Sequence, residues 1–251
     1  VSTYSPEELN ANTNDTSIPT PIPTPPKVTL KMFLKFWHNE IKPYHRTERF
    51  FHIIKQTNNN YIIKDDFVPF LQELLHFHPG LDFLDNHEEF QKKYALTVIV
   101  RIFYACNVSR TGRLTLKEII QSDLARAFMH VDEENDINRV RNFFSYEHFY
   151  VLYCRFFELD VDKDTKLSVE DVMRYSDHAL SEVIVDRVFQ VGQRVFSDGK
   201  EGGFRRSGMT YSDFVYMMLA EEDKTSIPSL RYWFNFCDLD GDGILTPEEL
   251  N

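Results

Sequence analysis

Three aspartates alternate with other residues near the end of the chain, at Asp238, Asp240 and Asp242. Carboxylates with this spacing can converge on one point of a loop, and Ca²⁺ is a hard cation that requires six to eight such oxygens. Gly243 stands at position 6 of this segment, where glycine permits the positive φ of a sharp turn. The carbonyl of Ile244 at position 7 and the long carboxylate of Glu249 at position 12 complete a predicted calcium loop.

The remaining positions of this loop also fit the EF-hand pattern. Leu245 at position 8 is expected to pack in the core and to join a two-residue strand pair with a neighbouring loop. Thr246 at position 9 is expected to reach the ion through water. A solvated acidic turn does not explain Gly243, Leu245 and Glu249 together, so we predict an EF-hand.

A second loop repeats the pattern with two departures. Its predicted ligands are Asp160, Asp162, Asp164, Lys166 at position 7 and Asp171 at position 12. Thr165 replaces glycine at position 6, where a left-handed backbone costs a non-glycine residue about 1–2 kcal/mol. Asp171 is shorter than glutamate, which makes bidentate binding harder. We expect weaker binding here or more tolerance of Mg²⁺, and the alternative is a hand kept only for packing.

A third loop, from Asn107 to Glu118, keeps the geometry but not the charge, because Asn, Ser and Thr fill positions 1, 3 and 5. One carboxylate does not offset the dehydration of Ca²⁺, so we predict a structural, ion-free hand.

The stretches that end at Asp66 and Asp213 are expected to serve at most as packing partners. We predict two strand pairs between these loops, Ile62 with Leu114 and Leu167 with Met209. The exit helix of the last hand is cut off at Asn251, which suggests a fragment of a longer protein and leaves that hand without an obvious mate.

Apolar residues recur every three or four positions in residues 30–41, 90–103, 143–157, 180–195 and 230–237, and over a short stretch at 214–218. Between them an aliphatic residue is followed four positions later by an acidic one, at Ile62/Asp66, Leu114/Glu118, Leu167/Asp171, Met209/Asp213 and Leu245/Glu249. This imperfect repeat predicts an all-α fold, an elongated array of EF-hand-like units of which two bind ions.

Ten residues, 17–26, contain five prolines, which favours an extended polyproline arm or spacer. A PxxP ligand at residues 23–26 is the alternative. We therefore predict three parts. Residues 1–26 form the arm, 27–142 a helical half with degenerate hands, and 143–251 the half with two calcium-binding hands.

Composition excludes several classes of protein. The 251 residues carry a net charge of −11, opposite to that of a general nucleic-acid binder. The apolar runs are too short to span a bilayer, and no signal peptide is visible. Three cysteines without CxxC spacing argue against a disulfide scaffold and favour a cytoplasmic or nuclear location.

No catalytic motif stands out among the other polar residues. His76 and His78 are two positions apart, so they do not share one face of a helix, and no HExxH, GxxxxGK[ST], GxGxxG or GxSxG sequence occurs. We therefore expect no enzyme activity. An enzyme regulated by calcium, with its catalytic residues in the N-terminal half, is the weakest hypothesis that we consider, behind the two non-enzymatic ones given below.

The two acidic loops lie far apart with degenerate hands between and before them, and three segments accompany them: KMFLKFWHNEIKPYHRTERFF, FHPGLDFLDNHEEFQKKYALTVIVRIFY and LDGDGILTPEEL. Over residues 24–251 this pattern closely resembles the B'' regulatory subunits of protein phosphatase 2A. The resemblance implies a subunit that docks on the HEAT-repeat scaffold, touches the catalytic subunit and directs dephosphorylation to chosen phosphoproteins. It places two functional calcium sites on the two acidic loops, and a scaffold-docking helix at Leu30, Phe33, Leu34 and Trp37.

The leading hypothesis is therefore a non-enzymatic targeting subunit whose scaffold contacts depend on bound calcium. The alternative is a stand-alone EF-hand sensor or buffer that captures helical targets. Six methionines, of which only Met217 and Met218 are adjacent, argue against the Met-rich groove that such a sensor would use.

Overall fold

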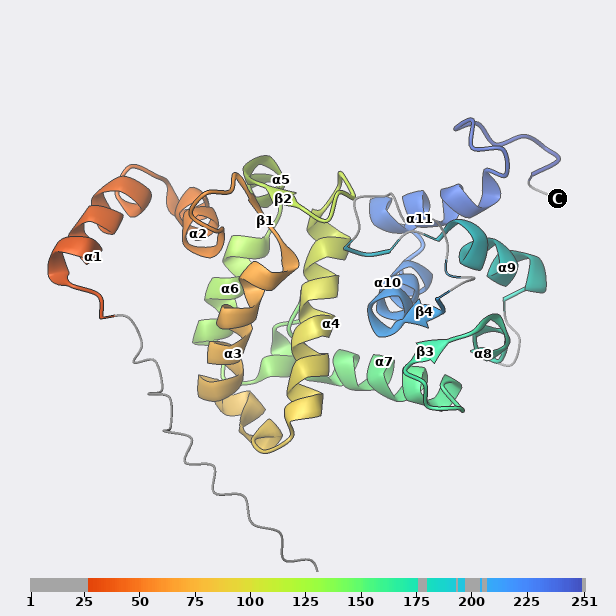
Figure 1. The fold of residues 1–251 in the computed structure, drawn as a ribbon, viewed down its shortest axis with the longest axis horizontal. Coiled ribbons are helices and arrows are strands. Elements are labelled where there is room, and N and C mark those ends of the chain that lie inside the picture. Colours follow the sequence, from red (N-terminus) through yellow and green to blue (C-terminus); the bar gives the residue numbers. More distant parts are fainter. Residues whose placement is uncertain (1–26, 176–179, 193, 197–203, 205–206, 250–251) are drawn as a thin grey trace, which may run out of the picture.

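The computed structural model describes residues 27–249, apart from 176–179, 193, 197–203 and 205–206. The predicted proline-rich arm, residues 1–26, lies outside the described residues. The regular secondary structure of the described chain is helical apart from four two-residue strands, as predicted (Figure 1). None of its helices is both long enough and apolar enough to cross a membrane.

Helices cover most of each predicted apolar stripe. The α-helices are α1 (Leu30–Phe36), α2 (Arg46–Ile54), α3 (Val68–Phe77), α4 (Glu88–Cys106), α5 (Leu116–Gln121), α6 (Leu124–Glu133), α7 (Tyr146–Leu159), α8 (Val169–Met173), α9 (Glu182–Val191), α10 (Tyr211–Glu222) and α11 (Ile227–Cys237). Five of these helices lie where no stripe was predicted, namely α2, α3, α5, α6 and α8. Short π or 3₁₀ turns are η1 (Trp37–Ile41), η2 (Lys64–Phe67), η3 (Pro79–Leu84) and η4 (Ile137–Arg139).

Two antiparallel strand pairs join the hands into two lobes. In the first lobe β1 (Tyr61–Ile62) pairs with β2 (Leu114–Thr115), which places Ile62 opposite Leu114. In the second lobe β3 (Lys166–Leu167) pairs with β4 (Met209–Thr210), which places Leu167 opposite Met209. All four position-8 residues are fully buried, so both predicted pairings are confirmed.

Helix α4 connects the two lobes through both of its faces (Figure 1). Tyr94 and Phe103 belong to the hydrophobic cluster of the first lobe, and Val100 belongs to that of the second. The Tyr94 hydroxyl donates a hydrogen bond of 2.6 Å to the carbonyl of Phe144. Because the two clusters share this helix, the predicted boundary between residues 142 and 143 is not a gap in the packing, and the domain division stays a prediction.

In three of the loops position 9 is also the N-cap of the helix that leaves the loop. Thr115, Ser168 and Thr210 each accept a hydrogen bond from the amide of the position-12 residue, whose carboxylate binds back to the cap. This reciprocal capping box satisfies two otherwise unpaired backbone donors at the start of the helix. Position 12 therefore has a structural role in these three hands, whether or not an ion binds.

The last loop corrects one expectation. Leu245 is only half-buried and lies in no strand, whereas the sequence led us to expect a core position and a strand pair. The described strands form only the β1–β2 and β3–β4 pairs, so the loop from Asp238 has no strand partner among the described residues. Without a partner strand, nothing draws Leu245 into the core.

Candidate metal sites

The Asp238 loop gathers its acidic side chains as the sequence predicts. Carboxylate oxygens of Asp238, Asp240 and Asp242 lie within 4.8 Å of one another. The Asp238 carboxylate accepts hydrogen bonds from the amides of Gly241 at 2.8 Å and Gly243 at 3.0 Å. These bonds wrap the backbone around Asp238, and φ of +82° at Gly243 makes the sharp turn.

Glu249 closes the same loop. One of its oxygens accepts from the Thr246 amide at 2.9 Å, and the other accepts from the Leu239 amide at 2.7 Å. These amide hydrogen bonds hold the pKa of Glu249 below its usual range, so the side chain is an anion at neutral pH. Arg187 of α9 donates to the carbonyl oxygens of Asp238 and Leu239, at 2.8 and 3.1 Å, and so ties the start of the loop to the second lobe.

The Asp160 loop forms a matching cluster. Oxygens of Asp160, Asp162 and Asp164 also lie within 4.8 Å of one another. Burial raises the pKa of Asp160 and the neighbouring carboxylates add to the shift, although the hydrogen bond from Thr165 opposes it. Thr165 adopts φ of +70°, so the structure confirms that a β-branched residue occupies the left-handed position.

The two predicted position-7 residues lie beside these clusters. The Lys166 amide donates to Asp164 at 2.8 Å, and the Ile244 amide donates to Asp242 at 2.7 Å. Each bond fixes the position-7 backbone next to the position-5 carboxylate. The side chain of Ile244 is exposed, so only its backbone serves the loop.

Arg174 is a residue that the sequence analysis missed. Its guanidinium forms an ion pair with one oxygen of Asp171 and donates to the Leu159 carbonyl at 3.1 Å. The other Asp171 oxygen accepts from the amide and hydroxyl of Ser168, both at 2.8 Å. A cation that recruits Asp171 must therefore displace Arg174. The i, i+3 spacing between Asp171 on α8 and Arg174 at the C-cap of that helix was the available signal, because residues three apart on a helix are neighbours.

The Asn107 loop fills its centre with a side-chain amide. Asn107 Nδ2 lies within hydrogen-bond distance of Ser109 Oγ at 3.1 Å, the Arg113 carbonyl at 2.9 Å and Glu118 Oε1 at 3.3 Å. These acceptors stand at positions 3, 7 and 12, which in an EF-hand bind the cation. Hydrogen bonds from Thr115 and Ser109 lower the pKa of Glu118, although burial, the largest single influence, opposes this shift. The amide hydrogens thus stand where a cation would.

The other two hands use internal donors in the same way. Arg194 forms an ion pair with the buried Asp213 and donates to the Gly208 carbonyl at 3.0 Å, which is position 7 of that hand. In the first hand Gln56 Nε2 donates to Asp66 at 2.8 Å. Sequence patterns did not indicate Arg194, because it lies 19 residues before its acidic partner. Three position-12 carboxylates are therefore satisfied by the protein itself.

Among the described residues, only the two predicted acidic loops have the donor set of a calcium site. Each combines three clustered carboxylates with a fourth at position 12, and hard oxygen donors are the ligands that Ca²⁺ and Mg²⁺ prefer. These residues fit an ion, which would supply the positive charge that the clusters lack. Each cluster lies in a loop with the spacing of an EF-hand, and such a donor set could hold a divalent cation.

Comparison with known proteins supports the class of protein that this fold and these loops define. A family model described as an EF-hand domain matches residues 45–134, the first lobe. A solved structure described as a PP2A PR70 holoenzyme contains a chain 41% identical to this one, with a TM-score of 0.74. The match covers 82% of this chain and 74% of that one. The protein is therefore an EF-hand protein of the fold found in that assembly.

Two curated relatives narrow the family. A probable B''delta regulatory subunit of protein phosphatase 2A from Arabidopsis thaliana is 53% identical over 81% of this chain and 37% of its own. The beta form of the human B'' regulatory subunit is 42% identical over 89% of this chain and 38% of its own. The chain belongs to the family of B'' regulatory subunits of protein phosphatase 2A. It spans about two-fifths of the length of these relatives.

Proposed function

We propose that this chain is the calcium-binding part of a phosphatase 2A regulatory subunit, which docks on the HEAT-repeat scaffold, contacts the catalytic subunit and directs dephosphorylation of phosphoproteins. The chain itself performs no chemistry. This agrees with the names of its relatives, which are regulatory subunits. Ca²⁺ binds at two sites, and the Asp160 loop also tolerates Mg²⁺. The protein acts in the cytoplasm or the nucleus and binds neither nucleic acid nor membrane.

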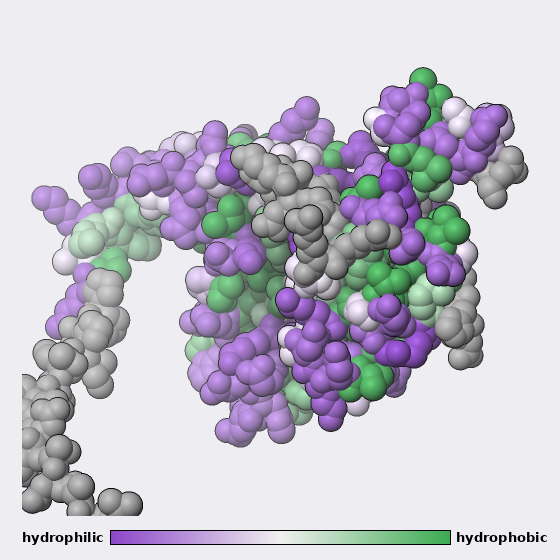
Figure 2. All heavy atoms as spheres, turned by 45° about the vertical axis from the view of Figure 1, so that its right-hand side comes forward, coloured by the Kyte–Doolittle hydropathy of each residue, from purple (hydrophilic) through white to green (hydrophobic). Residues whose placement is uncertain are grey.

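The observation that carries scaffold docking is the exposed apolar surface of α1 and the start of η1. No residue of α1 is buried, and Leu30, Phe33, Leu34 and Trp37 are 42–72% exposed. Figure 2 shows hydrophobic side chains on this helix at the N-terminal end of the described chain. A patch of large apolar residues on one helix is typical of a protein interaction surface. These are the four residues at which the sequence predicts the docking helix.

Calcium would act locally on the second lobe. A divalent ion relieves repulsion among the clustered carboxylates and fixes the angle between the entering and exit helices of its hand. Arg187 of α9 donates a hydrogen bond to the carbonyl of Asp238, so an ion that orders this loop would also restrain α9 in the second lobe. The scaffold would then meet a surface whose shape depends on the ions.

The test is a pull-down of the chain with purified phosphatase 2A scaffold, in calcium and in chelator. We expect capture in calcium, loss in chelator, and at least a tenfold weaker affinity for Phe33→Glu. Val183→Glu is the control, because Val183 is an apolar residue on helix α9 that is also exposed, at 74% against 48% for Phe33. Capture in both calcium and chelator would show that scaffold docking does not require bound calcium. No capture in either would leave the stand-alone sensor as the better hypothesis.

A further inference from the structure

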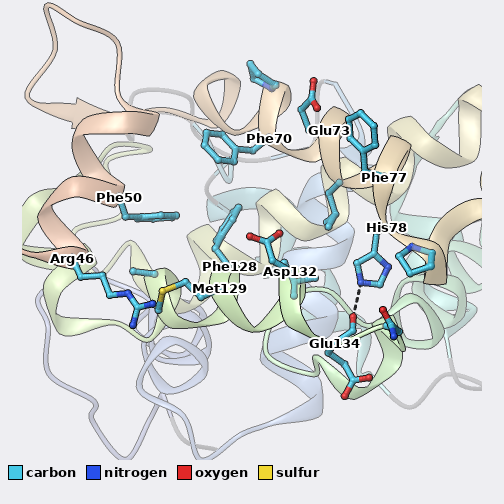
Figure 3. Close-up of a pocket in the computed structure, with 16 residues that line it drawn as sticks. Arg46, Phe50, Phe70, Glu73, Phe77, His78, Phe128, Met129, Asp132 and Glu134 are labelled. Atoms are coloured by element: carbon cyan, nitrogen blue, oxygen red, sulfur yellow. Dashed lines mark hydrogen bonds between the residues drawn. The ribbon is translucent and has the colours of Figure 1, made fainter. Parts of the chain in front are cut away.

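An apolar groove opens in the first lobe, and no residue of α1 or of either acidic loop lines it. It has a volume of about 590 Å³ and lies between α2, α3 and α6. Four phenylalanines line it, Phe50, Phe70, Phe77 and Phe128 (Figure 3). Phe77 is 69% exposed, which is unusual for so large an apolar side chain unless a partner covers it.

The groove is held open by contacts within the protein. His78 Nε2 lies 2.9 Å from the Glu134 carbonyl, and its Nδ1 accepts from the Gly80 amide at 3.0 Å. This buried histidine joins the end of α3 to the end of α6 (Figure 3). At the other end the ring of Phe128 packs 5.0 Å from that of Phe50 and 6.0 Å from that of Phe70. Because both loops of this lobe are satisfied by protein donors, the width of the groove does not depend on calcium.

The second lobe shows what such a groove accepts. There the first entering helix, α7, and the last exit helix, α10, both pack against α4. Thr97 and Tyr211 share a hydrogen bond of 2.8 Å across this contact, and the Phe90 ring lies 4.5 Å from that of Tyr153. In the first lobe the corresponding helices are α2 and α5, and the groove lies beside them, between α2, α3 and α6. Within the described part of the chain no helix fills this groove. An amphipathic helix is therefore the ligand that the architecture favours.

The charge of the groove selects among amphipathic helices. Glu73 and Asp132 line it, against the single cation of Arg46, whereas the carboxylate of Glu134 lies 3.8 Å from Arg139. An occupant with Lys or Arg on its polar face complements this charge. The N-terminal arm of this chain is a poor candidate, because residues 1–26 contain three acidic residues and no Lys or Arg. A second copy is disfavoured by the net charge of −11 on each chain.

We propose that this groove binds an amphipathic helix of another protein, with large apolar anchors on one face and lysine or arginine on the other. The site is distinct from the proposed scaffold-docking surface on α1, and its occupancy is independent of calcium. It gives the subunit a second attachment point, so scaffold docking and capture of this helix can occur together.

The test uses the whole chain and a fluorescent 14-residue model helix built only of leucine and lysine. Fluorescence polarisation in calcium and in chelator should give the same affinity, while the matching leucine and glutamate peptide should bind at least tenfold more weakly. Phe77→Ala and Glu73→Lys should each weaken the lysine peptide about tenfold. Phe83→Ala is the control, because Phe83 is 54% exposed just beyond α3 but does not line the groove.

Several results would overturn the proposal. Equal affinity for the two peptides, or an equal loss in the Phe83→Ala control, would show nonspecific binding. Tighter binding after deletion of residues 1–26 would make the arm the occupant. A concentration-dependent dimer in light scattering, absent in Phe77→Glu, would make a second copy the occupant. None of these outcomes depends on scaffold binding, so failure here and failure of the proposed function are separately visible.

Discussion

The ion pair between Arg174 and Asp171 predicts that removing one positive charge will strengthen calcium binding at the Asp160 loop. Arg174→Gln keeps most of the stem of the side chain but leaves Asp171 free to turn both oxygens toward the ion. The arginine side chain is 45% exposed and Asp171 is 11% exposed, so solvent screens the pair only in part. An ion pair of this kind contributes about 1 kcal/mol, which corresponds to about a fivefold gain in calcium affinity.

Titration calorimetry in an Asp238→Ala background isolates this loop from the last one. Arg155→Gln is the matched control, since Arg155 is exposed on α7 close to the same loop and removes the same charge. We expect the gain for Arg174→Gln and little change for Arg155→Gln. If both variants gain equally, the effect is long-range electrostatics. If Arg174→Gln gains nothing, the short stem of Asp171 alone limits the site.

The remaining predictions concern the other loops. Thr165→Gly should stabilise the protein to thermal unfolding by about 1 kcal/mol, because relief of the φ of +70° exceeds the entropy that glycine loses on folding; an unchanged Tm would contradict this. Asn107→Ala should destabilise by about 2 kcal/mol while calorimetry finds the same calcium stoichiometry; loss of an ion would show that this loop binds one. Glu118→Gln should cost about 2 kcal/mol at pH 7. Because the pKa of Glu118 is lowered in the fold, this cost should shrink as the pH falls below about 4, which denaturation at several pH values would measure. Asp238→Ala should abolish calcium binding at the last loop and weaken scaffold capture more than Asp160→Ala does; the reverse order in the pull-down would refute our ranking of the two sites.

The features that the sequence predicted are those set by local spacing. Carboxylates at positions 1, 3 and 5 converge because the loop backbone wraps around the first of them, as the amide bonds to Asp238 show. The strand partners were predictable because position 8 always carries the aliphatic residue. Two of them, Ile62 and Met209, stand in loops with almost no other EF-hand character. The capping box explains why position 12 stays acidic even in those loops.

The features that the sequence did not predict depend on residues that the fold brings in from elsewhere. Arg194 lies three residues beyond the end of α9, and the fold brings it to the carboxylate of Asp213, which is 19 residues further along the chain. At Leu245 the sequence predicted a feature that the structure lacks. The residue fits position 8 of the pattern, but no partner strand is available among the described residues, so no strand forms there. The groove in the first lobe was also missed, because its walls come from three helices whose apolar stripes alone predict only burial.

The five position-12 carboxylates divide the molecule into two kinds of hand. Asp171 and Glu249 stand in the two loops that have a cluster of three carboxylates, although Arg174 also pairs with Asp171. Asp66, Glu118 and Asp213 stand in loops without such a cluster among the described residues, and Gln56, Asn107 or Arg194 donates to them. Such hands need no ion to fix the angle between their helices, because the donor takes the place of the cation. The whole first lobe is built from hands of this kind, whereas each acidic cluster lies in a hand of the C-terminal half. Any effect of calcium on the structure must therefore begin in the C-terminal half. Helix α4 contributes residues to the hydrophobic clusters of both lobes, so it is the element that would transmit this effect to the first lobe.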